Sequence, residues 1–198
     1  MVLEVDAITF DDFGTLRCSV SKQEDVIYPI FRALSKRGIS LAEETFLNKY
    51  FKMDALYRKR LTETYQESLL DNVIADVLES LGFKSEVCKS AIKESVDYGL
   101  STRSVKWYPD ALPVLSTLRK RGYKLGLISN THWRLLESFR NKIERIFDVV
   151  TVSYEHGYAK PHPSIFLATL KKLGVEANRC LHVGDDPVAD VQRAKKLE

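Results

Sequence analysis

Carboxylates follow two short apolar segments that lie near opposite ends of the chain. Asp11 ends the apolar run Val5 to Phe10, while Asp185 and Asp190 follow the apolar run 180–183. In open α/β sheets, ligands bind outside the carboxyl ends of buried strands. We therefore predict one cleft in which the acids from both ends of the chain meet around a metal ion.

Strand and helix signals alternate at the start of the chain and again from Tyr108 onward, which is typical of an α/β fold. Short apolar segments predict strands at 5–10, 124–128, 147–152 and 180–183. Helices are expected to begin at Pro109, near His132, at Pro163 and after Pro187. We assign the chain to the α/β class, with a Rossmann-like parallel sheet as its core.

Residues 22–98 differ from the rest because their apolar side chains recur at helical spacing. Four stripes are expected to form the core of a helical bundle: Val26, Ile27, Ile30, Phe31 and Leu34; Phe46, Tyr50 and Phe51; Tyr65, Leu69, Leu70, Val73, Ile74, Val77, Leu78 and Leu81; and Ile92 with Val96. The connection between the first two strands takes roughly a hundred residues where about a dozen suffice, so the bundle is an insertion. We predict an inserted helical-bundle cap at 17–101 that acts as a lid over Asp11, and a hydrolase core at 1–16 and 102–198.

The overall composition excludes several classes of protein. The chain has 198 residues, of which 44% are hydrophobic and 29% charged, and no apolar run approaches the length of a membrane span. The net charge of +3 is small and basic residues alternate with acids, so neither nucleic acid nor a membrane is an expected partner. Three cysteines without metal or disulfide spacing, and a start without signal-peptide features, predict a cytoplasmic location.

Four short motifs follow one another along the chain. They are Phe10-Asp11-Asp12-Phe13-Gly14-Thr15-Leu16, the strand 125–128 ending in Ser129-Asn130, Lys160-Pro161 followed by Pro163 and Phe166, and Gly184-Asp185 with Asp190. In this order, with a helical insertion directly after the first, they resemble the haloacid dehalogenase-like hydrolase superfamily over essentially the whole chain. The insertion is similar to that of the small-cap subclass, which includes dehalogenases and many small-molecule phosphatases.

The resemblance implies a hydrolase with Asp11 as its nucleophile, since a carboxylate can attack phosphorus or an alkyl carbon and form an ester that water later hydrolyses. Thr15 and Ser129 would donate hydrogen bonds to a bound phosphoryl group, and Asn130 would help to bind the substrate. Lys160 would offset the negative charge of the transferring group. Each residue also has an ordinary structural alternative, in the turn, as a helix cap or on the surface.

The same resemblance implies a magnesium site. Asp185 would bind Mg²⁺ together with the Asp11 carboxylate and the backbone carbonyl of Phe13, since Mg²⁺ prefers oxygen ligands in an octahedron. Asp190 is assigned to the same site, where it either supports the ligands indirectly or favours the start of the last helix.

Position 13 departs from the pattern of the superfamily's phosphatases, which usually carry a second Asp two residues after the nucleophile. Phe13 cannot protonate a leaving group, and such acid catalysis typically contributes about 10²–10⁴-fold in rate. Dehalogenases of the superfamily carry an aromatic residue here, but Asp185 and Asp186 beside Asp11 would repel one another without a cation. His132 is either a substitute acid or a structural residue.

We predict a Mg²⁺-dependent phosphatase that acts on a small phosphorylated metabolite through an aspartyl-phosphate on Asp11. Without an acid at position 13, aryl or acyl phosphates are the favoured substrates. The alternatives are a 2-haloacid dehalogenase and a binding or regulatory protein of the same fold. Superfamily members usually continue past the fourth motif, so we expect the sheet to lack an edge strand. The exposed edge would allow a homodimer as well as a monomer, and a shortened chain is the other explanation.

Overall fold

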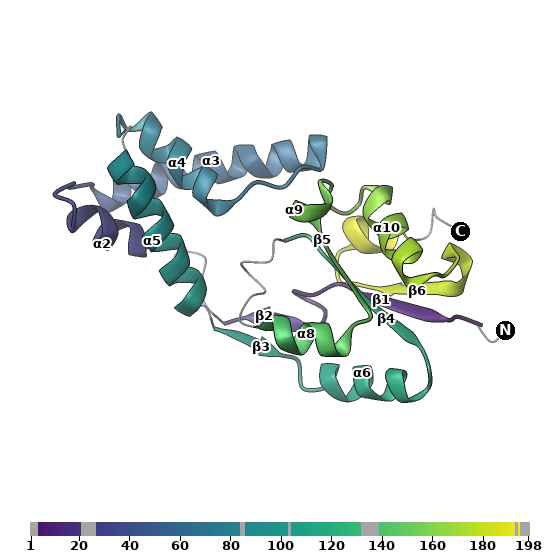
Figure 1. The fold of residues 1–198 in the computed structure, drawn as a ribbon. Helices are drawn as coiled ribbons and strands as arrows, with labels where there is room; N and C mark the ends of the chain where they lie inside the picture. The colour runs from purple at the N-terminus through teal and green to yellow at the C-terminus, as the bar shows by residue number, and fades with distance from the viewer. Residues whose placement is uncertain are drawn as a thin grey trace. The chain divides into compact units, whose positions relative to one another are not determined.

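Four parallel strands make the sheet at whose edge the acids were expected (Figure 1). They are β1 (Ala7–Phe10), β4 (Lys124–Ser129), β5 (Val149–Val152) and β6 (Cys180–Val183), in the order β5-β4-β1-β6. The computed structural model describes residues 4–20, 27–83, 86–102, 104–131, 139–192 and 194. Within these residues the predicted α/β class and parallel sheet are confirmed. The central strands β1 and β4 are buried almost throughout, as strands covered on both faces must be.

Helices cover both faces of this sheet (Figure 1). α6 (Ala111–Lys120) and α8 (Arg140–Ile146) lie on one face, and α10 (Pro163–Leu173) lies on the other. This follows from right-handed connections, because the chain moves outward from β1 to β4 and β5 and then returns to β6. The direction of the connections thus reverses between β1 and β6, which is where such sheets bind their ligands.

The limits of the elements differ from the prediction at several points. β6 is confirmed to the residue, and α10 begins at Pro163 and ends before Gly174, whose φ of 64° is left-handed. β1 begins two residues later than predicted, β5 also begins two residues later, and β4 extends through Ser129. The expected last helix is a π-helical turn, η3 (Pro187–Gln192). The start of the helix expected near His132 lies outside the described residues.

Four short elements of the described chain were not predicted. β2 (Arg17–Ser19) pairs antiparallel with β3 (Val105–Trp107), and these strands adjoin the two ends of the helical insertion. α9 (Ser153–His156) and the 3₁₀ turn η2 (Ala177–Arg179) each occupy a single turn. Segments of three or four residues are too short to show a hydrophobic period.

The residues of the predicted cap form helices with an apolar core of their own. The helices are α2 (Pro29–Ser35), α3 (Glu43–Thr64), α4 (Leu70–Ser80) and α5 (Glu86–Thr102). α2 packs on α5, and α4 packs on both α3 and α5. Ile30, Phe46, Ile74 and Ile92 show that each helix contributes to this core, as the predicted stripes require.

Three residues of those stripes, Phe51, Tyr65 and Leu69, lie outside the apolar core of the helical unit, so the prediction is wrong for them. Phe51 on α3 is 44% exposed. Tyr65 precedes α4 with a φ of 58°, and its carbonyl accepts a hydrogen bond from the N–H of Ala159 at 2.6 Å. Apolar spacing alone does not show where a helix begins, which is why Tyr65 was assigned to α4. Val26 lies outside the described residues.

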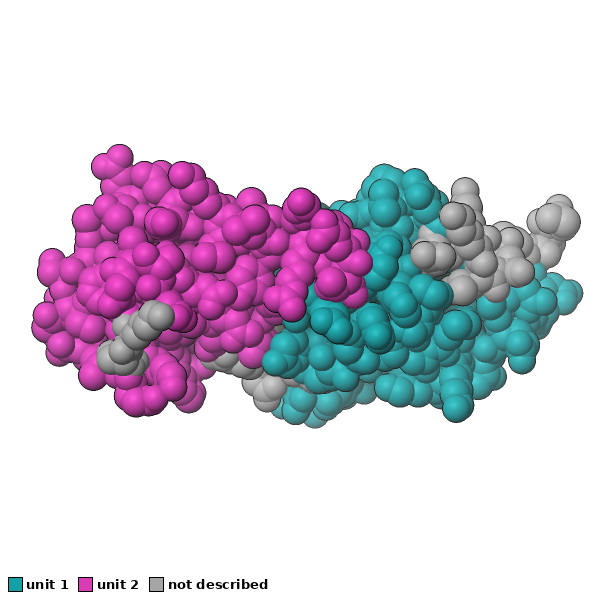
Figure 2. Space-filling view, turned by 90° about the horizontal axis from the view of Figure 1, so that it is seen from above, with its two compact units in different colours: residues 1–19, 65–67, 105–198 teal, residues 20–64, 68–104 magenta. Residues whose placement is uncertain are grey.

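The chain divides into two compact units, which Figure 2 shows in different colours. Unit 1 comprises Met1–Ser19, Tyr65–Glu67 and Val105–Glu198, and unit 2 comprises Val20–Thr64 and Ser68–Ser104. Unit 1 contains the sheet and all four motifs, and unit 2 contains the helical bundle. Among the described helices, none is both long enough and apolar enough to cross a membrane.

Candidate active site

The first motif begins where three neighbouring strands end. β1 pairs in register with β4 and β6, so that Phe10 lies beside both Leu127 and Val183. The N–H of Asp11 extends the pairing by donating to the carbonyl of Val183 at 2.8 Å. The residues that follow the three strands therefore emerge at one edge of the sheet, as the sequence predicted.

The ammonium of Lys160 bridges two carboxylates. Its Nζ donates to Oδ1 of Asp11 at 2.6 Å and to Oδ1 of Asp190 at 2.7 Å. The side chains of Lys160, Asp11 and Asp190 are 2%, 11% and 2% exposed. Buried charges need partners, and one cation between two anions leaves a net negative charge in the site.

The two carboxyl groups of this network titrate in opposite directions. Burial raises the pKa of Asp11 to about 6, although the nearby ammonium of Lys160 opposes the shift. Burial also acts to raise the pKa of Asp190, but the hydrogen bond from His182 and the charge of Lys160 outweigh it and lower the pKa to about 2. At neutral pH, Asp11 is thus an anion of raised basicity, which suits a nucleophile, and Asp190 is a firm anion.

Asp185 completes a group of three carboxylates with Asp11 and Asp190, and one oxygen of each lies within 4.8 Å of the others. Both oxygens of Asp190 accept hydrogen bonds from the protein, Oδ1 from Lys160 and His182 and Oδ2 from the N–H of Asp186 at 3.1 Å. Carboxylate oxygens are ligands that Mg²⁺ prefers, and a dication would offset their repulsion, so the residues fit this metal.

Two glycines allow the motifs to approach one another closely. A Cβ on Gly14, whose φ is 97°, would lie 2.2 Å from Oδ2 of Asp185. A Cβ on Gly184 would lie 2.2 Å from Cγ of Asp190. Side chains at either position would displace a carboxylate of the site, so both glycines supply room, and Gly14 also allows the left-handed backbone of the turn.

Asn130 holds the main chain of Lys160 at two points. Its Oδ1 accepts from the N–H of Lys160 at 2.7 Å, and its Nδ2 donates to the carbonyl of Lys160 at 2.9 Å. The peptide bond between Lys160 and Pro161 is cis. The residue predicted to bind substrate is thereby placed to orient Lys160.

The remaining predicted site residues lie at the ends of β1 and β4. Ser129 is 3% exposed and is the last residue of β4. Thr15 Oγ1 donates to Oδ1 of Asp185 at 3.3 Å, which joins the first motif to the fourth. Phe13, whose carbonyl was predicted to bind the metal, forms a single bridge with Arg17 in the same turn.

Comparison with known proteins places this site in a family. The sequence profile of the haloacid dehalogenase-like hydrolases matches residues 5–197. The chain belongs to this hydrolase family. The resemblance noted from the four motifs is thereby confirmed.

Relatives of this hydrolase include named phosphatases. It is 29% identical over 198 residues to the glyceraldehyde 3-phosphate phosphatase of Methanopyrus kandleri, a match that covers 97% of this chain and 80% of that protein. It is 38% identical over 93 residues to the glyceraldehyde 3-phosphate phosphatase of Pyrococcus abyssi, which covers 45% of this chain and 38% of the relative. The crystal structure of a 2-haloacid dehalogenase from Pseudomonas syringae pv. Tomato DC3000 shares the fold, with a TM-score of 0.74 and 24% identity over 98% of this chain and 83% of that one.

Phe13 of this hydrolase packs against an arginine that is enclosed by aromatic rings. The guanidinium carbon of Arg17 lies 5.0 Å from the ring centre of Phe13, 5.5 Å from that of Trp107 and 4.6 Å from that of Phe139. Arg17 is fully buried and pairs with the buried Asp12 through two nitrogens, Nε at 2.6 Å and Nη2. The aromatic residue at position 13 is therefore part of a packed cluster. His132, the alternative acid, lies outside the described residues.

His182 on β6 was missed by the sequence reasoning. Its Nε2 lies 3.1 Å from Oδ1 of Asp190, and its Nδ1 lies 2.9 Å from Oγ1 of Thr9. Burial lowers the pKa of His182, which keeps the imidazole neutral at neutral pH. The available signal was a histidine within the otherwise apolar strand 180–183.

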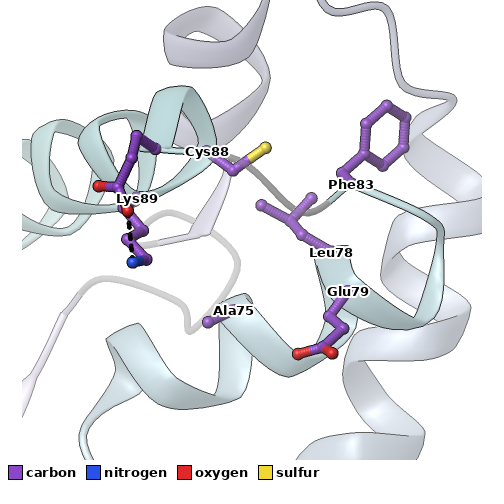
Figure 3. A pocket seen from close by; sticks show the side chains of 7 residues that line it. Ala75, Leu78, Glu79, Phe83, Cys88 and Lys89 are labelled. Carbon is purple, nitrogen blue, oxygen red and sulfur yellow. Dashed lines mark hydrogen bonds and ion pairs between the residues drawn. The ribbon is translucent and has the colours of Figure 1, made fainter.

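A cavity of about 460 Å³ lies within the helical unit (Figure 3). Its lining comes from the ends of α4 and α5 and the residues beside them: Ala75, Leu78, Glu79, Phe83, Glu86, Cys88 and Lys89. Lys89 is paired with Glu86 at 2.6 Å. The lining combines apolar groups with an ion pair and includes no residue of the four motifs, so we do not assign the chemistry to this cavity.

Proposed function

We propose that this hydrolase is a Mg²⁺-dependent phosphatase that acts on a small phosphorylated metabolite. The observation that carries the proposal is the ammonium of Lys160, bonded to Asp11 within a group of acids that includes Asp185. Attack of a carboxylate on a phosphoryl group brings two anions together, which needs cations that bind both. The names of the Methanopyrus and Pyrococcus relatives support a phosphorylated substrate.

The proposed roles follow from the positions of the side chains. Asp11 attacks phosphorus, the bond to the leaving oxygen breaks, and an aspartyl-phosphate forms; water then attacks phosphorus, which releases inorganic phosphate and restores the carboxylate. Lys160 holds Asp11 and offsets the charge of the phosphoryl group, to which Thr15 and Ser129 donate hydrogen bonds. Asn130 keeps the Lys160 main chain in place.

The residues that would hold Mg²⁺ are Asp11, Asp185 and the carbonyl of Phe13, with Asp190 acting indirectly. When bound, the metal would offset negative charge on the transferring group. We further propose that 1–16 and 102–198 form the hydrolase core and that 17–101 form the cap that selects the substrate. In this division, the residues of the cap determine which metabolite is bound.

The absence of an acid at position 13 predicts a preference among substrates. No acid stands at position 13, so the leaving oxygen departs without a proton from that residue. Aryl and acyl phosphates have stable leaving anions, whereas the alkyl ester of glyceraldehyde 3-phosphate does not. We therefore expect turnover to fall in the order acyl, aryl, alkyl phosphate.

Rapid-quench trapping tests the proposal. With Mg²⁺, acetyl phosphate or p-nitrophenyl phosphate should label the wild-type protein with an acid-stable phosphoryl group, and Asp11→Asn should abolish the label. Asp110→Asn, a change at an exposed residue, is the matched control and should label normally. A wild-type protein that releases phosphate without ever forming the phosphoenzyme would contradict the mechanism.

A 2-haloacid dehalogenase is the second candidate, and Phe13 is the observation in its favour. Halide leaves without a proton, so the missing acid costs such an enzyme nothing. The acids near Asp11 argue for the phosphatase, because a metal-free site would have to tolerate their repulsion. Release of halide from 2-chloropropionate in excess EDTA would reverse this ranking.

A further inference from the structure

His182 joins β6 to β1 beside the nucleophile. The parallel register places His182 directly opposite Thr9, and the Thr9 hydroxyl lies 2.9 Å from Nδ1 of the imidazole. Thr9 is two residues before Asp11, which directly follows the last residue of β1. The imidazole is 4% exposed, and the ring of Phe166 meets it edge to face with 5.1 Å between ring centres. The ring is thus held in one position by a hydrogen bond on one side and by packing on another.

The partners of His182 determine which of its nitrogens carries the proton. A carboxylate that is anionic can only accept, so the nitrogen 3.1 Å from Oδ1 of Asp190, Nε2, must donate. Nδ1 then accepts, and its donor is the hydroxyl of Thr9. This gives a directed chain of hydrogen bonds from Thr9 through His182 to Asp190.

Asp190 in turn sets the place of Lys160. Its Oδ1 accepts hydrogen bonds from His182 and Lys160, and its Oδ2 accepts one from the N–H of Asp186. These three donors fix the plane of the carboxylate. Lys160 has a single ammonium to share between Asp190 and Asp11. Without the imidazole, Oδ1 of Asp190 would keep Lys160 as its remaining donor, and the carboxylate would be held at fewer points.

We propose that His182 is a positioning residue for Lys160: by fixing the carboxylate of Asp190, it holds the ammonium where it can serve Asp11 and the phosphoryl group. The proposal rests on the proposed phosphatase function for its kinetic consequences. Groups that orient metal ligands through hydrogen bonds typically contribute about 10–100-fold to activity, and we expect an effect of this size here. His182 never touches the substrate in this proposal, so its effect falls on the chemical step.

The test compares His182→Leu, which removes both hydrogen bonds, with His182→Gln, whose side-chain N–H₂ can replace the donor at Nε2. With p-nitrophenyl phosphate and Mg²⁺, we expect His182→Leu to lower kcat and the rate of phosphoenzyme formation about 10–100-fold, with a much smaller change in KM. His182→Gln should recover most of the loss. His156→Gln, which replaces a histidine bonded to Ser164 outside this network, is the matched control and should keep wild-type rates. Equal rates in His182→Leu and wild type, or equal loss in the Leu and Gln variants, would overturn the proposal.

A second readout separates this proposal from the phosphatase function. The chain has four histidines, and two-bond ¹H–¹⁵N spectra of the wild-type protein report the tautomer of each imidazole. We expect neutral His182 with its proton on Nε2. A proton on Nδ1 instead would overturn the positioning role even in an active enzyme. If the wild-type protein turns over no phosphate ester, the proposed function fails, and the spectrum alone then decides the hydrogen-bond chain.

Discussion

Asp11 and Asp190 share one ammonium, yet their environments act on them in opposite ways. Asp11 holds its charge at a cost, because burial raises its pKa from 3.8 to about 6. Asp190 is stabilised as an anion, because His182 and Lys160 more than offset its burial and lower its pKa from 3.8 to about 2. A carboxylate that burial destabilises in this way is common at active sites, where stability is lost in favour of reactivity.

This difference predicts opposite effects of two similar substitutions. Between about pH 4 and pH 6 the folded protein binds a proton at Asp11 that the unfolded chain has lost, so ionisation of Asp11 lowers the free energy of unfolding as the pH rises. Asp11→Asn should therefore raise the free energy of unfolding at pH 7 by about 1–3 kcal/mol in metal-free buffer and change it little near pH 4. Urea unfolding at the two pH values measures this. A less stable Asp11→Asn at pH 7 would show that Lys160 stabilises the ionised carboxylate more than burial destabilises it.

Substitution of Asp190 is expected to change the free energy of unfolding in the opposite direction. Its stabilising contribution is present above about pH 4 and is lost as the pH falls through the folded-state pKa of about 2. Asp190→Asn should lower the free energy of unfolding at pH 7 by about 1–3 kcal/mol, an effect that shrinks in acid. Asp110→Asn, at an exposed residue, serves as the common control for both substitutions. If Asp190→Asn is as stable as the wild type at pH 7, the ionised carboxylate of Asp190 adds nothing to the free energy of unfolding.

At the scale of elements, the sequence predicts a strand or helix well where its boundaries are marked chemically. α10 begins at Pro163 and ends before Gly174, and both marks are legible in the sequence. β2 and β3 carry no such marks and have three residues each, so they were missed. The phase of a helical stripe also cannot show that Tyr65 stands outside α4 with a left-handed φ.

The sequence alone also predicts the site only in part. Asp11, Lys160 and Asp185 could be nominated from their motifs, and the parallel register brings their strands together. The contacts of Asn130 and His182 could not be predicted, because they join residues 30 and 173 positions apart in the sequence. Which polar atoms meet across a sheet depends on the fold, and the local sequence carries no record of it.

The turn after β1 offers a prediction of its own. Gly14 and Gly122 both have left-handed φ, of 97° and 86°, so replacing either by Ala carries a similar backbone cost of about 1 kcal/mol. Only at Gly14 would the new Cβ meet a carboxylate, that of Asp185, whereas nothing lies within 4 Å at Gly122. Gly14→Ala should thus lose Mg²⁺-dependent turnover about 10-fold or more, while Gly122→Ala keeps it. Turnover and thermal unfolding of the two variants are to be measured side by side. An equal loss of activity in both variants would contradict this prediction.

At the scale of the whole molecule, the described residues form a small apolar cluster of Ile128, Ile165 and Phe166 and two large, separate apolar cores. One lies between the sheet and its helices, around Leu115, Leu125 and Leu127. The other is built by α2 to α5 of the helical unit. The carboxylates that fit a metal belong to the first unit alone, since Asp11 follows β1 and Asp185 follows β6. A ligand of these carboxylates should act on the stability of one unit more than on that of the other.

Mg²⁺ binding tests this separation. Both tryptophans, Trp107 and Trp133, fall in the segment Val105–Glu198 of unit 1, so fluorescence follows that unit, whereas far-ultraviolet circular dichroism also follows the helical unit. At about 100 times its Kd, Mg²⁺ stabilises the folded state by about 2.7 kcal/mol, which corresponds to a shift of about 10–15 °C in a unit of this size. We expect the fluorescence midpoint to rise by this amount and the helical signal to retain a transition that Mg²⁺ does not move. Asp185→Asn should remove the shift and Asp110→Asn should keep it. Two midpoints that move together would show that the units unfold as one, and an unmoved fluorescence midpoint would show that these carboxylates hold no metal.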